Sequence, residues 1–445
     1  MSLLPIYNLR EEAVTTALTA TSALGNVAPS FNTSQSLDPK EYPYEIRNSW
    51  GKPWATLTLL AHPRLSRTTP TFLQGSSIAG SVKLSLSNRE RIECIAIIVR
   101  GKLVTWDESE SERRVSFWRL REVLWEMDMG DPRSSRGTDA GGRWGDKLHG
   151  EYRWEFSIKI PELLDAQPSD GERPRRLPHS FTERFSIPKI TYEVKLRLNR
   201  GRFRPDDRLI VPFAYFTMQQ PGPPSPMRQL AYQNNTDIPG PHLDSDGWHA
   251  LEPVQIRGAI FGERAVDAKC TVFLAKPLCY TRSTSIPCAM AIETEDPQAA
   301  DLLASIKSST VYLQQCVSYT LGRSSTEITP CGQASWWPAK DAAALLRNPL
   351  QRHLMGKVQL RKDLQPSSTI KQFQVEYEIV VFPFGAVAFK PESSSPLATH
   401  GVEIVTCFAP GPRPRVPTNP VYEPNDAFVD KYYSSQPKRL PRIII

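Results

Sequence analysis

The chain has 445 residues, 40 of them proline, and a formal net charge of +7. No apolar run reaches the ~18 residues of a membrane span, and Arg10, Glu11 and Glu12 stand where a secretion signal would be apolar. We therefore expect neither a transmembrane nor a secreted protein, but a cytoplasmic one. So many prolines predict long connections and ordered turns, because proline is excluded from helix interiors and central strands.

The basic excess favours acidic partners, such as phosphorylated tails or an anionic membrane surface. Aromatic residues are not interleaved with the basic runs, and no zinc-finger or RNA-binding signature occurs. We therefore expect no nucleic-acid partner.

The seven cysteines are an odd number, and no Cys-x-x-Cys pair occurs. Several lie in apolar runs, as Cys94 does in Ile-Glu-Cys-Ile-Ala-Ile, which predicts buried free thiols in a reducing compartment. Cys270, Cys279 and Cys288 are evenly spaced, but successive hairpin strands give the same spacing and no histidine is nearby. We expect neither a metal site nor a cofactor.

The first 45 residues are rich in Ser, Thr, Ala and Pro without a sustained period, which predicts a mostly disordered N-terminal tail. Strand-like segments then follow in series. We predict strands at 55–61, 78–87, 92–106, 115–127, 152–160, 181–187, 191–199 and 209–218, with long polar loops at 128–150 and 165–180.

The strand at 191–198 has the clearest pattern. It reads Thr-Tyr-Glu-Val-Lys-Leu-Arg-Leu, so polar and apolar residues alternate strictly. A side-chain period of two gives a strand one dry face and one wet face. The pattern returns at 372–381, which indicates that the chain uses the same architecture twice.

Residues 219–252 begin Gln-Gln-Pro-Gly-Pro-Pro-Ser-Pro and stay polar, which predicts an interdomain linker. A second series of strands is predicted at 253–261, 264–275, 286–294, 309–321, 354–361, 370–383 and 401–408. Short helices are predicted at 298–305 and within 331–350, and 410–445 is a proline-rich C-terminal tail. Short strands, long turns and little helix predict an all-β protein with two antiparallel β-sandwiches in tandem, at 46–218 and 253–409.

The order and spacing of several passages resemble the arrestin family, especially its α-arrestin branch. In the first block, 80–86 followed by 92–101 resembles the paired early strands of an arrestin N-terminal domain, and Ser180-Phe181 followed by 190–200 resembles the signature P-x-S-F…I-x-Y-x-V-x-A. In the second block, 284–293 resembles the C-domain strand G-x-x-I-P-V-x-V without its usual glycine, and 311–315 and 377–381 resemble later strands. The resemblance spans about 46–408 and implies the arrestin fold, in which both β-sandwiches are immunoglobulin-like.

This resemblance also implies a function. α-Arrestins are cytosolic adaptors in membrane-protein trafficking, not enzymes. They recognise the cytosolic tails of a transporter or receptor and recruit a WW-domain, HECT-type ubiquitin ligase for endocytosis or sorting. We therefore expect a cytoplasmic adaptor that is recruited to the plasma membrane or to endosomes.

Ligase binding in that family uses PPxY or LPxY motifs, because a polyproline II segment is already extended and loses little entropy on docking. This chain has no PPxY. Leu4, Pro5 and Tyr7 complete an LPxY motif in the N-terminal tail, and Pro420 and Tyr422 belong to Asn-Pro-Val-Tyr in the C-terminal tail. We predict that these two motifs bind WW domains.

Basic residues also gather at the end of the alternating strand. The candidate anion-binding set is Arg197, Arg200, Arg202 and Arg204. Arg197 and Arg200 lie on or just past the polar strand face, whereas solvation alone is the simpler explanation for all four.

Catalytic signatures do not appear in the sequence. The histidines show no metal spacing, and no G-x-S-x-G, P-loop or G-x-G-x-x-G occurs. The acidic run at 106–112 is better explained as a solvated hairpin tip than as two carboxylates flanking a glycosidic bond. Two alternatives remain open: an arrestin-fold scaffold or coat subunit of the retromer type without ligase recruitment, and a carbohydrate-active β-sandwich enzyme.

Overall fold

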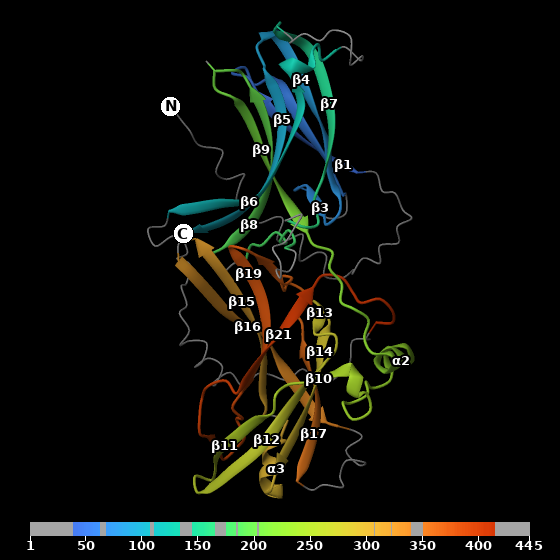
Figure 1. Cartoon of the computed structure of the whole chain (residues 1–445), viewed down its shortest axis with the longest axis vertical. Coiled ribbons are helices and arrows are strands. Elements are labelled where there is room, and N and C mark those ends of the chain that lie inside the picture. The colour runs from blue at the N-terminus through green and yellow to red at the C-terminus, as the bar shows by residue number, and fades with distance from the viewer. Residues whose placement is uncertain are drawn as a thin grey trace. The chain divides into compact units, whose positions relative to one another are not determined.

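The computed structural model describes residues 39–62, 68–106, 111–133, 145–164, 175–183, 186–202, 204–306, 308–321, 323–339 and 350–413. Within these ranges the chain is all-β, and helices are confined to short segments (Figure 1). None of the helices in these ranges is long and apolar enough to cross a membrane. The chain divides into two compact units, Met1–Thr217 and Met218–Ile445.

The first unit has two sheets. The four-stranded sheet has the order β1 (Lys40–Arg47), β2 (Pro53–Ala61), β4 (Ser77–Glu90), β7 (Leu148–Lys159), and all its neighbours are antiparallel. The five-stranded sheet has the order β3 (Thr71–Leu73), β9 (Asp207–Phe216), β8 (Lys189–Asn199), β5 (Cys94–Trp106), β6 (Glu112–Glu126), and only β3 pairs in parallel. A 3-10 turn, η2 (Met127–Met129), follows β6.

The period-two pattern of these strands explains how the unit forms its core. In β2, Ala55, Leu57 and Leu59 are completely buried, while the residues between them are partly exposed. The alternating apolar residues of β8 are buried in the same way. Each sheet therefore has an apolar face, and burying both faces together gives the sandwich-like arrangement of this all-β unit.

The second unit is one long curled sheet with short additions. Its main strands are β11 (Val254–Ile260), β12 (Arg264–Ala275), β13 (Cys279–Thr281), β14 (Ser285–Thr294), β15 (Thr310–Leu321), β16 (Arg323–Pro338), β17 (Gln351–Gln359), β19 (Phe373–Phe382), β20 (Phe389–Pro391) and β21 (Ala398–Val405). They follow the order β13-β21-β19-β15-β16-β17-β14-β12-β11-β20. β10 (Trp248–Ala250) pairs with β12, and β18 (Ser368–Ile370) pairs with β19. The helices among the described residues of this unit are α2 (Pro226–Asn234), η3 (Ser245–Gly247) and α3 (Pro297–Leu303).

β16 joins the two halves of this sheet. Its residues up to Gln333 pair with β15, and Ala334–Pro338 pair with β17. The sheet therefore turns from one half to the other within a single strand.

In each unit, one buried tyrosine of a strand donates a hydrogen bond to a backbone carbonyl earlier in the chain. In β8, Tyr192 is 2 % exposed, and its hydroxyl donates to Pro178 O at 2.6 Å. In β19, Tyr377 is 1 % exposed, and its hydroxyl donates to Gln365 O at 2.7 Å. The similarity predicted for 191–198 and 372–381 therefore extends from their alternation to a matching hydrogen bond.

Several boundaries differ from the sequence prediction. The predicted N-terminal tail, 1–45, ends too late, because β1 already begins at Lys40. This strand lies at the edge of its sheet, where Pro43 is tolerated, and it buries Tyr42. Within the strand predicted at 181–187, the described residues show a single bridge, between Phe181 and Ile190, and 184–185 lie outside them.

The second unit also differs in its connections. Residues 219–252, predicted as a linker, include α2, η3 and β10, and β10 pairs with β12 of the second unit. In the region 331–350, where a helix was predicted, β16 continues to Pro338, and 340–349 lie outside the described residues. The helix predicted at 298–305 is confirmed as α3, whose start is capped by the Asp296 carboxylate.

The seven cysteines are all free, as predicted. Cys270 and Cys288 are completely buried, whereas Cys94 is partly exposed. Burial raises the pKa of the Cys270 thiol to about 12 and raises the pKa of Cys288 as well. Burial also raises the pKa of Cys94, but there the Arg121 guanidinium opposes the shift.

We expect iodoacetamide to alkylate Cys94 well before Cys270 or Cys288 in the native protein. The thiolate is the reactive species, and a raised pKa leaves little of it at neutral pH. Mass mapping of native and urea-unfolded samples measures this order. Equal rates for Cys94 and Cys270 in the native protein would contradict the described burial.

Candidate functional site

The outer face of the five-stranded sheet in the first unit gathers basic side chains from four neighbouring strands. Residues directly opposite each other on paired strands point to the same face. One such row joins Arg121, Ile98, Lys195 and Ile210, and the next joins Arg119, Arg100, Glu193 and Pro212. Apolar Val194 and Leu196 flank these rows on β8 and point into the core.

We call this surface the basic face. It consists of Arg100, Lys102, Arg114, Arg119, Arg121, Lys189, Lys195, Arg197 and Arg208. In the rows of described residues that hold these side chains, Glu193 is the one acidic residue. The face is therefore positive, although Asp206 and Glu112, just outside these rows, neutralise part of its charge by pairing with Arg197 and Arg114.

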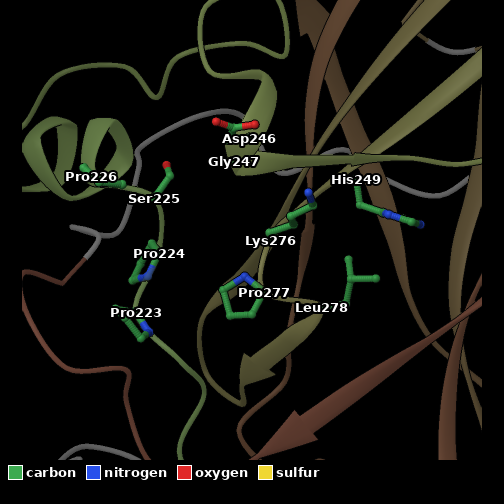
Figure 2. A pocket seen from close by; sticks show the side chains of 10 residues that line it. All are labelled: Pro223, Pro224, Ser225, Pro226, Asp246, Gly247, His249, Lys276, Pro277 and Leu278. Atoms are coloured by element: carbon green, nitrogen blue, oxygen red, sulfur yellow. The ribbon is translucent and has the colours of Figure 1, made fainter.

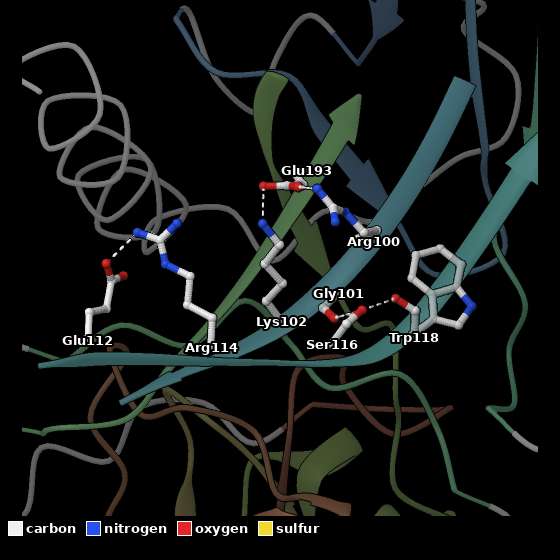
Figure 3. Close-up of polar contacts among 8 residues, drawn as sticks. All are labelled: Arg100, Gly101, Lys102, Glu112, Arg114, Ser116, Trp118 and Glu193. Carbon is white, nitrogen blue, oxygen red and sulfur yellow. Dashed lines mark hydrogen bonds and ion pairs between the residues drawn. The ribbon is translucent and has the colours of Figure 1, made fainter. Parts of the chain in front are cut away.

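Glu193 lies at the centre of the basic face and is 7 % exposed. Its carboxylate accepts from Arg100 Nη2 at 2.5 Å and from Lys102 Nζ at 2.6 Å (Figure 3). Arg100 Nε is buried and has no acceptor among the described residues. One carboxylate thus orders two cations but leaves a guanidinium N–H unsatisfied.

The cations of this face repel each other. The pKa of Lys195 is lowered, first by burial and then by Arg208, Arg100 and Arg197. The pKa of Lys102 is lowered by burial and by Arg100 and Arg114, while Glu193 opposes the shift. An anion bound here would relieve this repulsion and would raise both pKa values.

The outer part of the basic face is open to a partner. Arg119, Arg121 and Arg208 are exposed, and β6 lies at the edge of its sheet. Arg121 Nη2 donates to the Cys94 sulfur at 3.6 Å, and Arg208 Nη2 lies 3.8 Å from Asp206 Oδ2. Their guanidinium groups are therefore placed to bind carboxylate or phosphate oxygens in pairs.

The predicted anion-binding arginines do not lie together on this face. Arg197 belongs to it and pairs with Asp206 at 2.6 Å. Arg200 is largely buried between Glu90, at 2.6 Å, and Asp207, and its guanidinium lies over the Trp54 ring. Arg204 is exposed 3.7 Å from Glu90, and Arg202 is exposed in the same loop. Arg200, which directly follows β8, thus links the end of β4 to the start of β9 through its two ion pairs.

Sequence reasoning missed the basic residues of β5 and β6. In β5 the residues before Arg100 are apolar on both faces, so no polar face can be read there. In β6, Arg119 and Arg121 alternate with Leu120, and this is a signal that could have been read. Their assembly with β8 depends on pairings between residues far apart in the chain, which no local pattern shows.

The two tail motifs, with Leu4, Pro5, Tyr7, Pro420 and Tyr422, lie outside the described residues. Within the described ranges, no group of His, Cys, Asp or Glu residues is arranged to hold a metal ion. No protein-family model matches the chain, and no curated protein matches it.

Proposed function

We propose that the chain is an arrestin-like adaptor in membrane-protein trafficking, whose basic face binds an acidic or phosphorylated cytosolic segment of a transporter or receptor. The main support is the excess of cations over one sheet face of the first unit. The likeness to arrestins supports the proposal only as an analogy of sequence passages with an all-β architecture.

The composition of the basic face favours the binding of an anionic ligand over catalysis. Its residues offer positive charge from four strands and no pair of a nucleophile with a base. The exposed Arg119, Arg121 and Arg208 would meet the anionic groups first, while Glu193 holds Arg100 and Lys102 in fixed positions. A phosphorylated residue brings roughly −1.5 to −2 charges, so a cluster of such residues would complement this face.

The second half of the proposed function is ligase recruitment by the two tails. The LPxY motif of Leu4, Pro5 and Tyr7 and the motif of Pro420 and Tyr422 would bind a WW-domain, HECT-type ubiquitin ligase. The adaptor would then work in the cytoplasm and reach the plasma membrane or endosomes together with its cargo.

Charge reversal tests the basic face. We expect a variant with Arg119→Glu, Arg121→Glu and Lys195→Glu to bind a peptide with clustered phosphoserines at least about tenfold more weakly than the parent chain, because the local field changes sign. The matched control reverses Lys83, Arg91 and Arg153, which are exposed cations of the other sheet or its loops. Fluorescence anisotropy gives both affinities.

Two further controls separate the effect of the peptide's negative charge from that of its amino-acid sequence. The same peptide without phosphates should bind weakly, and added salt should weaken binding of the phosphorylated form. Equal loss of binding in both triple variants would show only a dependence on net charge and would refute the role of the basic face. Preference for anionic vesicles over the phosphopeptide would identify a membrane surface as the partner instead.

A pull-down on immobilised WW domains tests ligase recruitment. We expect the intact chain to bind and a Tyr7→Ala/Tyr422→Ala variant to lose binding, because the tyrosine of such motifs fills its own pocket. Absence of binding by the intact chain would reject ligase recruitment and favour a scaffold or coat subunit.

A further inference from the structure

The second unit contains an open pocket of ≈ 580 Å³ that lies outside the basic face. It lies between the segment before α2 and the turn from β12 to β13. Pro223 and Pro224 form one side, and Pro277 and Leu278 form the other (Figure 2). Its volume is in the range of roughly 300–1,000 Å³ that is typical of ligand sites. We call it the proline pocket.

Its walls are fixed by a buried arginine. Arg228 of α2 is 4 % exposed, and its Nη2 donates to Gly247 O at 2.9 Å and to Lys276 O at 2.5 Å. Gly247 and Lys276 both line the pocket, so one guanidinium joins three segments of the chain around it. Lys276 N also donates to Gly247 O at 2.8 Å.

Hydrogen bonds also fix the segment that carries Pro223 and Pro224. Ser225 lies between Pro224 and Pro226, and its hydroxyl donates to Asp244 Oδ2 at 2.5 Å. The same hydroxyl oxygen accepts from Arg228 N at 3.3 Å and caps α2. Because the pyrrolidine rings also fix the backbone φ angle, the pocket exists before any ligand arrives.

The chemistry of the lining selects an aromatic ring that carries a hydrogen-bond donor. Pyrrolidine rings and the Leu278 side chain present flat aliphatic surfaces on which an aromatic ring packs well. Asp246 supplies an acceptor for an indole N–H or a phenol O–H, and Lys276 supplies a donor for a neighbouring peptide carbonyl. Asp246 also disfavours a phosphate or carboxylate ligand by repulsion.

We propose that the proline pocket binds the side chain of a tryptophan or tyrosine in an extended segment of a partner protein. The ring lies between Pro223 and Pro277, and its polar hydrogen is donated to the Asp246 carboxylate. This site is independent of the proposed adaptor function, since it uses the second unit and not the basic face.

Capped tripeptides Gly-X-Gly, with Trp, Tyr, Phe or Leu at X, test the proposal on the full chain by NMR titration. We expect Trp to bind about tenfold more tightly than Leu, because a larger flat surface is buried and one hydrogen bond is added. A Pro223→Ala/Leu278→Ala variant should lose about tenfold in affinity for Trp. Leu230→Ala on the exposed side of α2 is the control and should bind like the parent chain.

Asp246→Asn tests the hydrogen bond separately. It keeps the shape of the side chain, and it should reduce the preference for Trp over Phe without changing the affinity for Phe. The proposal is overturned if Leu binds as tightly as Trp, if the double variant binds like the parent chain, or if Asp246→Asn leaves the preference for Trp unchanged. Circular dichroism melts establish that each variant is folded.

Discussion

Replacing Glu193 by glutamine is expected to weaken the fold of the first unit and, in the same protein, to tighten the binding of a phosphorylated peptide. The carboxylate lies 2.5 Å from Arg100 Nη2 and 2.6 Å from Lys102 Nζ. Removing one partner from a buried ion pair leaves the other charges uncompensated. Such a change costs roughly 3–5 kcal/mol, and since an amide oxygen still accepts one hydrogen bond, we expect the free energy of unfolding to fall by about 3 kcal/mol, the lower end of that range.

The gain in binding follows from the same change. The variant removes the central negative charge of the basic face, so the potential that an anionic ligand meets becomes more positive. Urea unfolding followed by tryptophan fluorescence measures the first effect, and fluorescence anisotropy measures the second. Glu155→Gln is the matched control, because that carboxylate is exposed on β7 at 3.3 Å from Arg153 and its loss changes the net charge equally.

The stability deficit of this variant should depend on pH. Glu193 acts to raise the pKa of Lys102, so its loss lowers that pKa further below the ordinary value of 10.5. The folded state then binds the Lys102 proton more weakly than the unfolded state does. Wherever the parent carboxylate is ionised, the deficit is therefore complete below the pKa of Lys102 in the folded variant, and it shrinks as the pH rises toward the pKa of Lys102 in the unfolded state. A stable variant that binds phosphopeptide no better than the parent chain would contradict both roles of Glu193.

Replacing Tyr192 by alanine is expected to have the largest effect on stability in the first unit, about 3–5 kcal/mol. Its ring packs edge-on against Phe117 and Trp118, with centroids at 5.9 and 6.3 Å, and lies 5.5 Å from Phe213 and 5.3 Å from Tyr215. Because four aromatic neighbours surround it, the cavity left by alanine cannot collapse without moving several strands.

Two further variants divide this effect into its parts. Tyr192→Phe keeps the ring but leaves Pro178 O without its donor, so we expect a smaller loss of about 1–2 kcal/mol. Trp50→Ala removes an even larger side chain that is 90 % exposed and should change the free energy of unfolding by less than about 0.5 kcal/mol. Urea unfolding measures all three, and an equal loss for Tyr192→Phe and Tyr192→Ala would show that ring packing contributes nothing.

The sequence predicted those features that depend on local periodicity. The alternation at 191–198 and 372–381 identified β8 and β19 and, within them, the two tyrosines that are buried. Local periodicity did not predict the features that depend on where a strand lies in its sheet. β1 contains a proline that an edge strand tolerates, and β16 continues to Pro338, into the first part of the region 331–350 where a helix was predicted.

The candidate sites were harder to predict than the strands. The basic face requires the register between β5, β6 and β8, in which Arg100 meets Glu193 across the sheet. The proline pocket requires 223–224 to face 277–278, and the hydrogen bonds of the buried Arg228 help to fix that approach. Both are properties of long-range pairing, so the pattern of one segment can show a polar strand face, as in β6, but not which strands bring their side chains together.

The strand shared by both halves of the second unit has a consequence for how that unit responds to stress. β16 hydrogen-bonds to β15 along most of its length and to β17 at its end, so both halves share one backbone strand. A thermal fluctuation or a pulling force that separates β15 from β16 therefore acts on the same strand that carries the ladder with β17. The second unit thus behaves mechanically as a single element, which transmits strain along one continuous backbone instead of absorbing it at a joint.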